Sequence, residues 1–156
     1  MMPYFNLVSP TYIENWPDAL HRLSIASARV PLLEGEAEAL GASNGEYAEA
    51  FPAPHFRDLS ALQQRLDDAI QRFPGGAFVR LGSRSPKDSW DGAANGFRCL
   101  DGARAIKLLT DSSERVSDDL HLAIANGYTP SIWVRQWLEI QPWQEWRCLM
   151  RGRKLI

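Results

Sequence analysis

Residues 58–81 read DLSALQQRLDDAIQRFPGGAFVRL, a stretch that joins a helical pattern to a strand pattern. Apolar side chains recur in it at spacings of three or four residues, as they do on one face of a helix: Leu59, Leu62, Leu66, Ile70 and Phe73. Asp58 is a favoured N-cap residue for such a helix, and Pro74-Gly75-Gly76 ends it. The stretch therefore predicts a helix over 58–73 followed by a strand over 77–81.

The same reasoning extends in both directions along the chain. It predicts further elements before and after this stretch: helices over 17–23, 101–110 and 115–126, and a strand over 24–31. Ser112 or Ser113 can cap the last of these helices, and Gly127 can end it. Residues 34–57 are rich in Gly, Ala, Glu and Pro, so we expect them to form a mobile surface insertion.

The C-terminal segment has a different pattern. Residues 131–140 and 144–150 both alternate, and Pro142 lies between them, which predicts two antiparallel strands. Residues 151–153, Arg-Gly-Arg, are typical of a turn into a further strand. Helices and strands are thus mixed along one chain, and the predicted fold class is α+β.

Composition excludes several classes of protein. The chain has 156 residues, 45% of them hydrophobic and 23% charged, which is ordinary for a folded protein and argues against disorder. A net charge of −2 gives no basic excess, so a dedicated nucleic-acid binder is not expected. No apolar run is long enough for a membrane span, and the first residues carry no secretory signal, so we expect a cytoplasmic protein. The two cysteines and three histidines lack the spacing of metal ligands.

Period-two alternation sorts the C-terminal side chains into two faces. Trp133, Arg135 and Trp137 share one face of the first predicted strand, and Glu145 and Arg147 share one face of the second. Guanidinium groups bind phosphate oxygens and aromatic rings pack on a base, so this surface suits an anionic ligand with a flat ring. The alternative is a solvated sheet face with cross-strand ion pairs.

A polar loop, GSRSPKD, follows the strand predicted over 77–81 and occupies residues 82–88. Flexible backbone, hydroxyls and cations after a strand can hold a phosphate, although the spacing of a P-loop is absent. The alternative is a polar turn whose basic side chains are solvated.

Taken together and in order, these blocks resemble the cell division cycle protein 123 family, a divergent branch of the ATP-grasp proteins. The resemblance covers about residues 14–156 and is strongest from residue 77 onward. It is carried by FVRL at 78–81, RSPKD at 84–88, LL at 108–109, SS at 112–113, DL at 119–120, RxW at 135–137, Pro142 and EWRC at 145–148.

The resemblance implies ATP bound with Mg²⁺ between two subdomains of an ATP-grasp-like fold. Here these would be an α+β subdomain over 1–130 and the first strands of an incomplete second one over 131–156. The nucleotide-binding residues that it implies are Arg80, Ser85, Pro86, Lys87, Arg135, Trp137, Glu145 and Arg147. The family's metal-holding residues lie beyond Ile156, so no metal ligand is expected within the chain, which would be only the N-terminal part of the family.

The sequence departs from the family's pattern at two further places. Gly82-Ser83 stands where the family has Asn-Trp, and Asp111 stands where it has a lysine. Lys107, one helical turn earlier, is the residue we expect to substitute for that lysine.

Two functions follow from the resemblance. One is an ATP-dependent ligase that activates a carboxylate. The other is a non-catalytic ATP-binding chaperone with a protein client, as the family's role in assembling translation initiation factor 2 implies. We also expect self-association through 131–156, because a sheet ending there would leave Ile132, Val134 and Leu138 uncovered beside an open strand edge.

Overall fold

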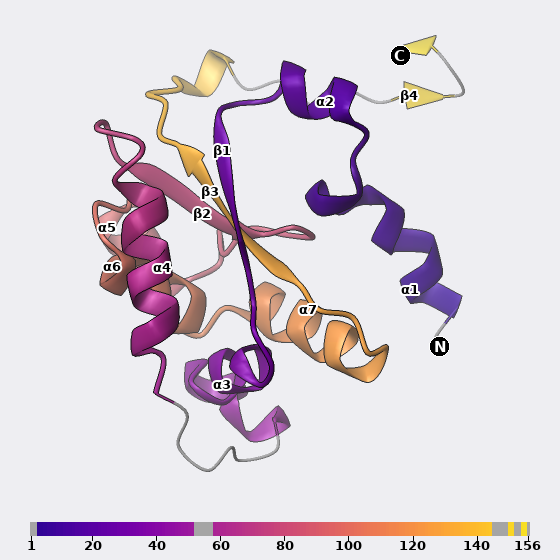
Figure 1. Cartoon of the computed structure of the whole chain (residues 1–156), viewed down its shortest axis with the longest axis vertical. Coiled ribbons are helices and arrows are strands. Elements are labelled where there is room, and N and C mark those ends of the chain that lie inside the picture. Colours follow the sequence, from indigo (N-terminus) through magenta and orange to yellow (C-terminus); the bar gives the residue numbers. More distant parts are fainter. Residues whose placement is uncertain (1–2, 52–57, 145–149, 152–153, 156) are drawn as a thin grey trace.

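The computed structural model describes residues 3–51, 58–144, 150–151 and 154–155 (Figure 1). A three-stranded antiparallel sheet lies at the centre, with strand order β1-β3-β2. Its strands are β1 (Ser27–Pro31), β2 (Ala77–Leu81) and β3 (Ser131–Gln136). The fold is therefore a mixed α+β fold built on a small antiparallel sheet.

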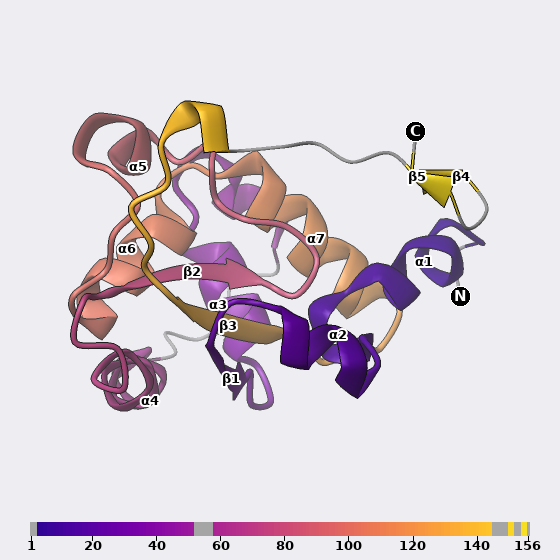
Figure 2. The same ribbon diagram turned by 90° about the horizontal axis from the view of Figure 1, so that it is seen from above.

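Helices surround this sheet on both sides. They are α1 (Pro3–Val8), α2 (Asp18–Leu23), α3 (Glu36–Ala42), α4 (Ser60–Ile70), α5 (Trp90–Asn95), α6 (Gly102–Thr110) and α7 (Glu114–Ala125). Four 3₁₀ turns accompany them: η1 (Ser9–Thr11), η2 (Ile13–Asn15), η3 (Gly45–Ala50) and η4 (Pro142–Gln144). Figures 1 and 2 show α1 and α2 on the side of the sheet away from α4, α5 and α6.

One face of the sheet forms the core. Val79 of β2 and Val134 of β3 are paired and fully buried, and Ile132 lies beside them on the same face. Helix α4 contacts β1 and β3, while α6 contacts β2, so these two helices cover this face. Because the side chains at these three positions are apolar and buried, a binding site on this sheet would lie on the opposite face.

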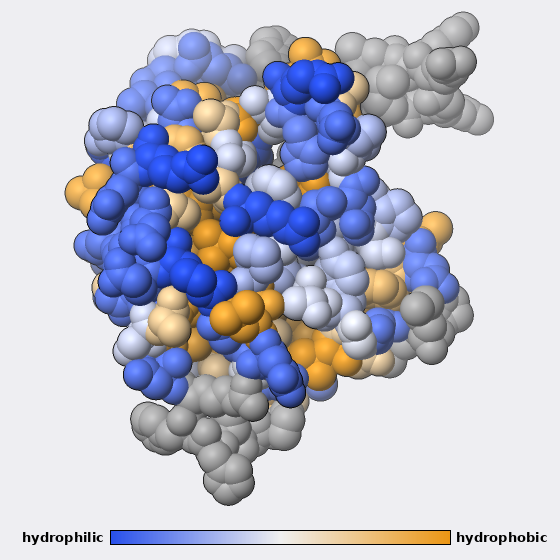
Figure 3. Space-filling view, viewed as in Figure 1, coloured by the Kyte–Doolittle hydropathy of each residue, from blue (hydrophilic) through white to orange (hydrophobic). Residues whose placement is uncertain are grey.

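The helix predicted over 58–73 is confirmed as α4, with shorter bounds. Leu62, Leu66 and Ile70 on its inner face are at most 2% exposed. The N-cap residue is Leu59 and not Asp58 as predicted, although the Asp58 carboxylate accepts a hydrogen bond from the Ser60 amide at 2.9 Å. Figure 3 shows hydrophilic side chains over α4 on the outer surface, as expected for an amphipathic helix.

The helices predicted over 101–110 and 115–126 are confirmed as α6 and α7, within one residue at each end. The Asp101 carboxylate caps α6 by accepting from the Arg104 amide at 2.7 Å. The Ser113 hydroxyl caps α7 by accepting from the Val116 amide at 3.2 Å. After α7, Gly127 adopts a φ of 61°, a left-handed conformation that glycine tolerates best.

The prediction of a surface insertion over 34–57 is wrong for α3, whereas residues 45–50 contain no buried residue. Helix α3 packs on α7, Leu40 is fully buried, and Phe51 is 5% exposed. A Cβ on Gly41 would lie 2.3 Å from the Phe51 ring, so the small residues of this segment permit close packing. Residues 52–57 lie outside the described part of the chain.

The predicted pairing of 131–140 with 144–150 is wrong for the residues that form β3. Both edges of β3 are occupied, one by β1 and the other by β2. The strand ends at Gln136, and residues 142–144 form η4. The structure thus places β3, the first strand assigned to a second subdomain, at the centre of the sheet formed with β1 and β2.

A short hairpin follows at the C-terminal end, where β4 (Met150–Arg151) pairs with β5 (Lys154–Leu155). The expected further strand is therefore present. The reason given for self-association is wrong for Ile132 and Val134, which are fully buried, whereas Leu138 is 43% exposed.

Candidate functional site

Three arginines, one from each strand, lie on the face of the sheet opposite the core. Arg29 of β1 and Arg80 of β2 are both paired with Trp133 of β3, one on either side. Arg135 lies two residues along β3 from Trp133 and is paired with Phe78 of β2. Because directly paired residues share a face, this surface combines three guanidinium groups with two aromatic rings.

Arg80 is held in place by the backbone around it. Its Nε donates to the Leu81 carbonyl at 3.0 Å, and one terminal nitrogen donates to the Ser83 carbonyl at 2.8 Å. Burial lowers the pKa of Arg80 and the like charge of Arg135 lowers it further, while the more weakly acting charges of Asp119 and Glu14 raise it. The two guanidinium groups are therefore close enough to repel each other.

Arg135 and Arg29 each have a hydroxyl partner. Arg135 donates to the Ser24 hydroxyl at 2.7 Å, and Arg29 donates to the Ser131 hydroxyl at 2.9 Å. Burial lowers the pKa of Arg135 as well. Within the described part of the chain, no carboxylate forms an ion pair with any of the three arginines. The surface is thus a partly desolvated cationic patch that an anion would stabilise.

Trp133 connects this face to the N-terminal segment. Its indole Nε1 donates to Glu14 at 3.0 Å, and its ring stacks on His21 of α2 at a centroid distance of 5.4 Å. The other oxygen of Glu14 accepts from the Tyr128 hydroxyl at 2.9 Å. A Cβ on Gly82 would overlap the Glu14 carboxylate, so glycine permits this close approach.

The loop over 82–88 runs from the Ser83 carbonyl, which accepts from Arg80, to Asp88 at the start of α7. Ser85 and Pro86 are buried within it, whereas Lys87 is exposed. Asp88 accepts from the Ser113 hydroxyl at 2.7 Å and from the Arg115 amide at 3.0 Å. The end of the loop therefore supports the start of α7.

Trp137 lies just beyond β3. Its amide donates to the Gly76 carbonyl at 3.0 Å, and its indole donates to Glu139 at 2.9 Å. Of the eight residues implied by the resemblance, Arg80 and Arg135 share one face of the sheet. Ser85, Pro86 and Lys87 lie in the loop after β2, and Trp137 lies just beyond β3. Glu145 and Arg147 lie outside the described residues.

Lys107 and Asp111 have structural partners. Lys107 pairs with Asp91 at 2.8 Å, and Arg104 pairs with the same carboxylate. Asp111 accepts hydrogen bonds from the Asp91 amide and, at 3.5 Å, from the Ser89 hydroxyl, both at the start of α5. Lys107 is thus already ion-paired within the protein, which argues against the expectation that it takes the place of the family's lysine.

Sequence reasoning left Arg29 out of the site, although it placed Trp133 on the same strand face as Arg135. Alternation within 27–31 could have placed Arg29 opposite the buried Ala28 and Val30. Its neighbour across the sheet, however, comes from a strand about one hundred residues later, and only the fold shows that pairing.

A metal site and a membrane-spanning helix are both absent from the residues that the structure describes. In that part of the chain, no group of three or more His, Cys, Asp or Glu side chains is placed to hold a metal ion. None of the helices there has the length and apolar character that crossing a membrane requires. The chemistry offered by the described surface is therefore anion binding by arginine beside aromatic rings.

Comparison with known proteins gives consistent results. The family model D123 matches residues 33–156. A Dictyostelium discoideum protein named "Translation initiation factor eIF2 assembly protein" is 30% identical over 107 residues, which are 64% of this chain and 28% of that protein. "Cell division cycle protein 123" of Phaeosphaeria nodorum is 29% identical over 127 residues, which are 74% of this chain and 33% of that protein.

A solved structure shares the fold. Cdc123 from Schizosaccharomyces pombe superposes with a TM-score of 0.76 over 97% of this chain and 62% of that chain, at 18% identity. The chain spans between 28% and 35% of the length of the curated relatives it matches. The family match covers well over half of the 156 residues and confirms the resemblance noted in the sequence, so the chain belongs to the D123 family, that of cell division cycle protein 123.

Proposed function

We propose that this chain forms the phosphate-binding surface of a nucleotide site, in a protein that assists the assembly of a translation initiation factor. The observation that carries the nucleotide part is the placement of Arg80 and Arg135 on neighbouring strands of one sheet face, with no carboxylate ion-paired to either among the described residues. A triphosphate would neutralise both charges, and ATP, as implied by the ATP-grasp resemblance, is the nucleotide we propose.

The chain's own residues would act by binding and orienting. Arg80 is fixed by two carbonyls, so its guanidinium group is already oriented before a ligand arrives. Arg135 and Arg29 extend the charge across the other two strands. The described residues offer no cluster for Mg²⁺, so their part in the proposed site is to hold the phosphate groups.

Binding measurements test the nucleotide part. We expect titration calorimetry of the full chain to show ATP binding that Arg135→Gln weakens about tenfold or more, as loss of a hydrogen bond to a charged group predicts. Arg72→Gln, at an exposed position after α4, removes the same charge and should leave affinity unchanged. AMP should bind more weakly than ATP if the phosphates carry the interaction. Equal losses in the two variants, or equal affinity for AMP and ATP, would contradict the proposal.

The assembly part rests on the names of the relatives. Two of them are called translation initiation factor eIF2 assembly proteins, and we extend that role, and with it a cytoplasmic location and a protein client, to this chain. These names favour the assembly role over a carboxylate-activating ligase. Co-purification of the chain with purified eIF2 subunits, with and without ATP, tests it. Failure of eIF2 to bind while ATP still binds would remove the client and leave the nucleotide site.

A further inference from the structure

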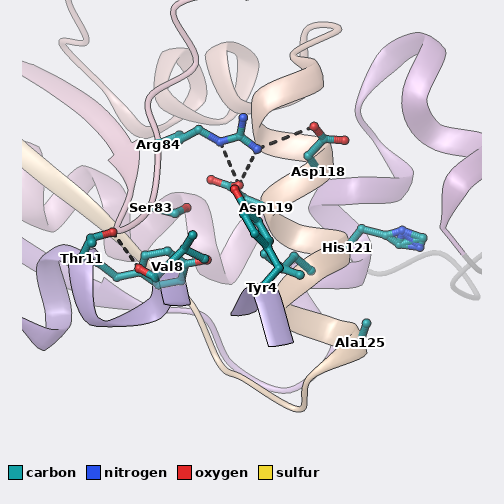
Figure 4. A pocket seen from close by; sticks show the side chains of 11 residues that line it. Tyr4, Val8, Thr11, Ser83, Arg84, Asp118, Asp119, His121 and Ala125 are labelled. Carbon is teal, nitrogen blue, oxygen red and sulfur yellow. Dashed lines mark hydrogen bonds and ion pairs between the residues drawn. The ribbon is translucent and has the colours of Figure 1, made fainter. Parts of the chain in front are cut away.

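A cavity of about 590 Å³ lies on the other side of the 82–88 loop, between α1, η1 and α7 (Figure 4). Its volume falls in the range of small-molecule sites. Apolar side chains from α1 and α7 line part of it, including Val8 and Leu122, and the rings of Tyr4 and Tyr12 add aromatic walls. The cavity thus offers apolar surface beside a small number of charged groups.

The charged groups are two carboxylates and one guanidinium. Arg84 donates twice to the same oxygen of Asp119, Oδ1, at 2.9 Å from Nε and 2.6 Å from a terminal nitrogen. The same terminal nitrogen lies 3.6 Å from Asp118 Oδ2. Figure 4 shows these contacts as dashed lines, with His121 directed away from them. One positive charge therefore faces two negative ones.

The second carboxylate oxygen of Asp119, Oδ2, takes no part in these contacts. The Asp119 side chain is only 7% exposed, and its Oδ2 atom is buried without any hydrogen-bond partner in the described structure. Arginine usually pairs with a carboxylate through both oxygens, whereas here both donors converge on one. A buried carboxylate oxygen without a donor is unfavourable, so the site lacks a hydrogen-bond donor.

The negative charge of Asp119 also affects the pKa of the neighbouring Tyr12 phenol. Burial and the charge of Asp119 raise the pKa of Tyr12 to about 12. Tyr4 lines the cavity as well, and it is 63% exposed at the cavity's edge.

We propose that this cavity binds an organic ammonium group carried on an apolar stem, with Asp119 Oδ2 accepting the hydrogen bond from the ammonium. A divalent metal is disfavoured, because it needs several oxygen ligands and no group of three or more His, Cys, Asp or Glu side chains among the described residues is placed to hold one. An anion is disfavoured by the excess of carboxylates. The ammonium can belong to a free amine or to a lysine side chain of a partner protein. The proposal does not depend on nucleotide binding at the sheet face.

NMR titration of the full chain tests this inference with phenethylammonium as the probe and phenethyl alcohol as its uncharged counterpart. We expect saturable shifts with the amine and at least tenfold weaker binding of the alcohol. Asp119→Asn should weaken the amine at least tenfold. Asp68→Asn, at an exposed position on α4, removes the same charge elsewhere and should leave binding unchanged.

A second variant covers the case in which Asp119→Asn does not fold. Val8→Phe fills the cavity from α1 and leaves the Arg84–Asp119 pair intact, so it should abolish binding. A capped lysine, N-acetyl-lysine methylamide, identifies the source: if it binds as tightly as the amine, a lysine side chain fits, and if only the amine binds, the ligand is a free amine. Absence of saturable binding by both amines, equal binding of amine and alcohol, or unchanged binding in either cavity variant would overturn the proposal.

Discussion

Arg80 and Arg135 lie on neighbouring strands of one sheet face, and the charge of Arg135 lowers the pKa of Arg80. Such a pair of like charges is unfavourable in the ligand-free protein, since neither has a carboxylate partner among the described residues. An anion that binds between them removes this repulsion. Ligand binding and stability should therefore be coupled at this site.

The first prediction concerns that coupling. Inorganic triphosphate at 100 times its dissociation constant should stabilise the chain by about 2.7 kcal/mol, because it binds the folded state alone. For a chain of this size that corresponds to a rise in Tm of about 5–10 °C. Differential scanning fluorimetry measures it. Arg80→Gln should abolish most of the rise, whereas the exposed Arg72→Gln should retain it; a full rise in the Arg80 variant would contradict the assignment.

Local sequence signals predicted the elements that depend on local interactions. The 3.6-residue periodicity located α4, and capping preferences narrowed the N-cap of α7 to Ser112 or Ser113, of which the structure shows Ser113. Strand β2 has the predicted bounds because Pro74-Gly75-Gly76 ends the preceding helix. Strand pairing, by contrast, depends on contacts between distant residues, so a hairpin from 131 to 150 was as compatible with alternation as the observed central β3.

Composition was misleading for residues 36–42. Gly and Ala are common in mobile loops, but at Gly41 the small side chain permits contact with Phe51 in the core. In the candidate site, the resemblance identified Arg80 and Arg135. Arg29 required knowledge that β1 pairs with β3, which alternation within one strand does not supply.

The second prediction concerns the close contact between Gly82 and Glu14. Gly82→Ala would push Glu14 from its position, and the carboxylate would lose its hydrogen bonds from Trp133 and Tyr128. We expect a loss of about 1.5–3 kcal/mol in the free energy of unfolding, the scale of a hydrogen bond to a charged group. Urea denaturation measures it.

The matched control is the same substitution in a Glu14→Ala background. With the carboxylate gone, the added methyl group has room, so the second step should cost much less than in the native chain. Equal costs in both backgrounds would show that the destabilisation comes from another source.

The third prediction concerns stability at high pH. Burial raises the pKa of Tyr12 to about 12, and burial also raises the pKa of Tyr128, so both phenols stay protonated in the folded chain after they ionise in the unfolded one. The unfolded state then binds fewer protons, and stability falls as pH rises above about 10, the usual pKa of tyrosine. Each phenol contributes at most about 1.4 kcal/mol per pH unit.

Urea denaturation between pH 9 and pH 11.5 tests the sign. Tyr12→Phe keeps the ring contacts with Phe5 and Tyr128 and removes one ionisable group, so its stability should fall less steeply. Parallel pH profiles for the native chain and this variant would show that Tyr12 ionises equally in both states.

The fourth prediction separates support of a helix from ligand binding at Asp88. This residue belongs to the RSPKD segment that carries the family resemblance, yet its carboxylate accepts from the Ser113 hydroxyl and the Arg115 amide at the start of α7. Asp88→Ala should therefore lower the free energy of unfolding by about 0.5–2 kcal/mol, the usual cost of losing a helix cap. Its ATP affinity, measured by calorimetry below the melting transition, should equal that of the native chain. Asp68→Ala, on the exposed face of α4, is the control and should change neither quantity. If Asp88→Ala weakened ATP binding without lowering stability, the carboxylate would act on the ligand, and its contacts with α7 would be incidental.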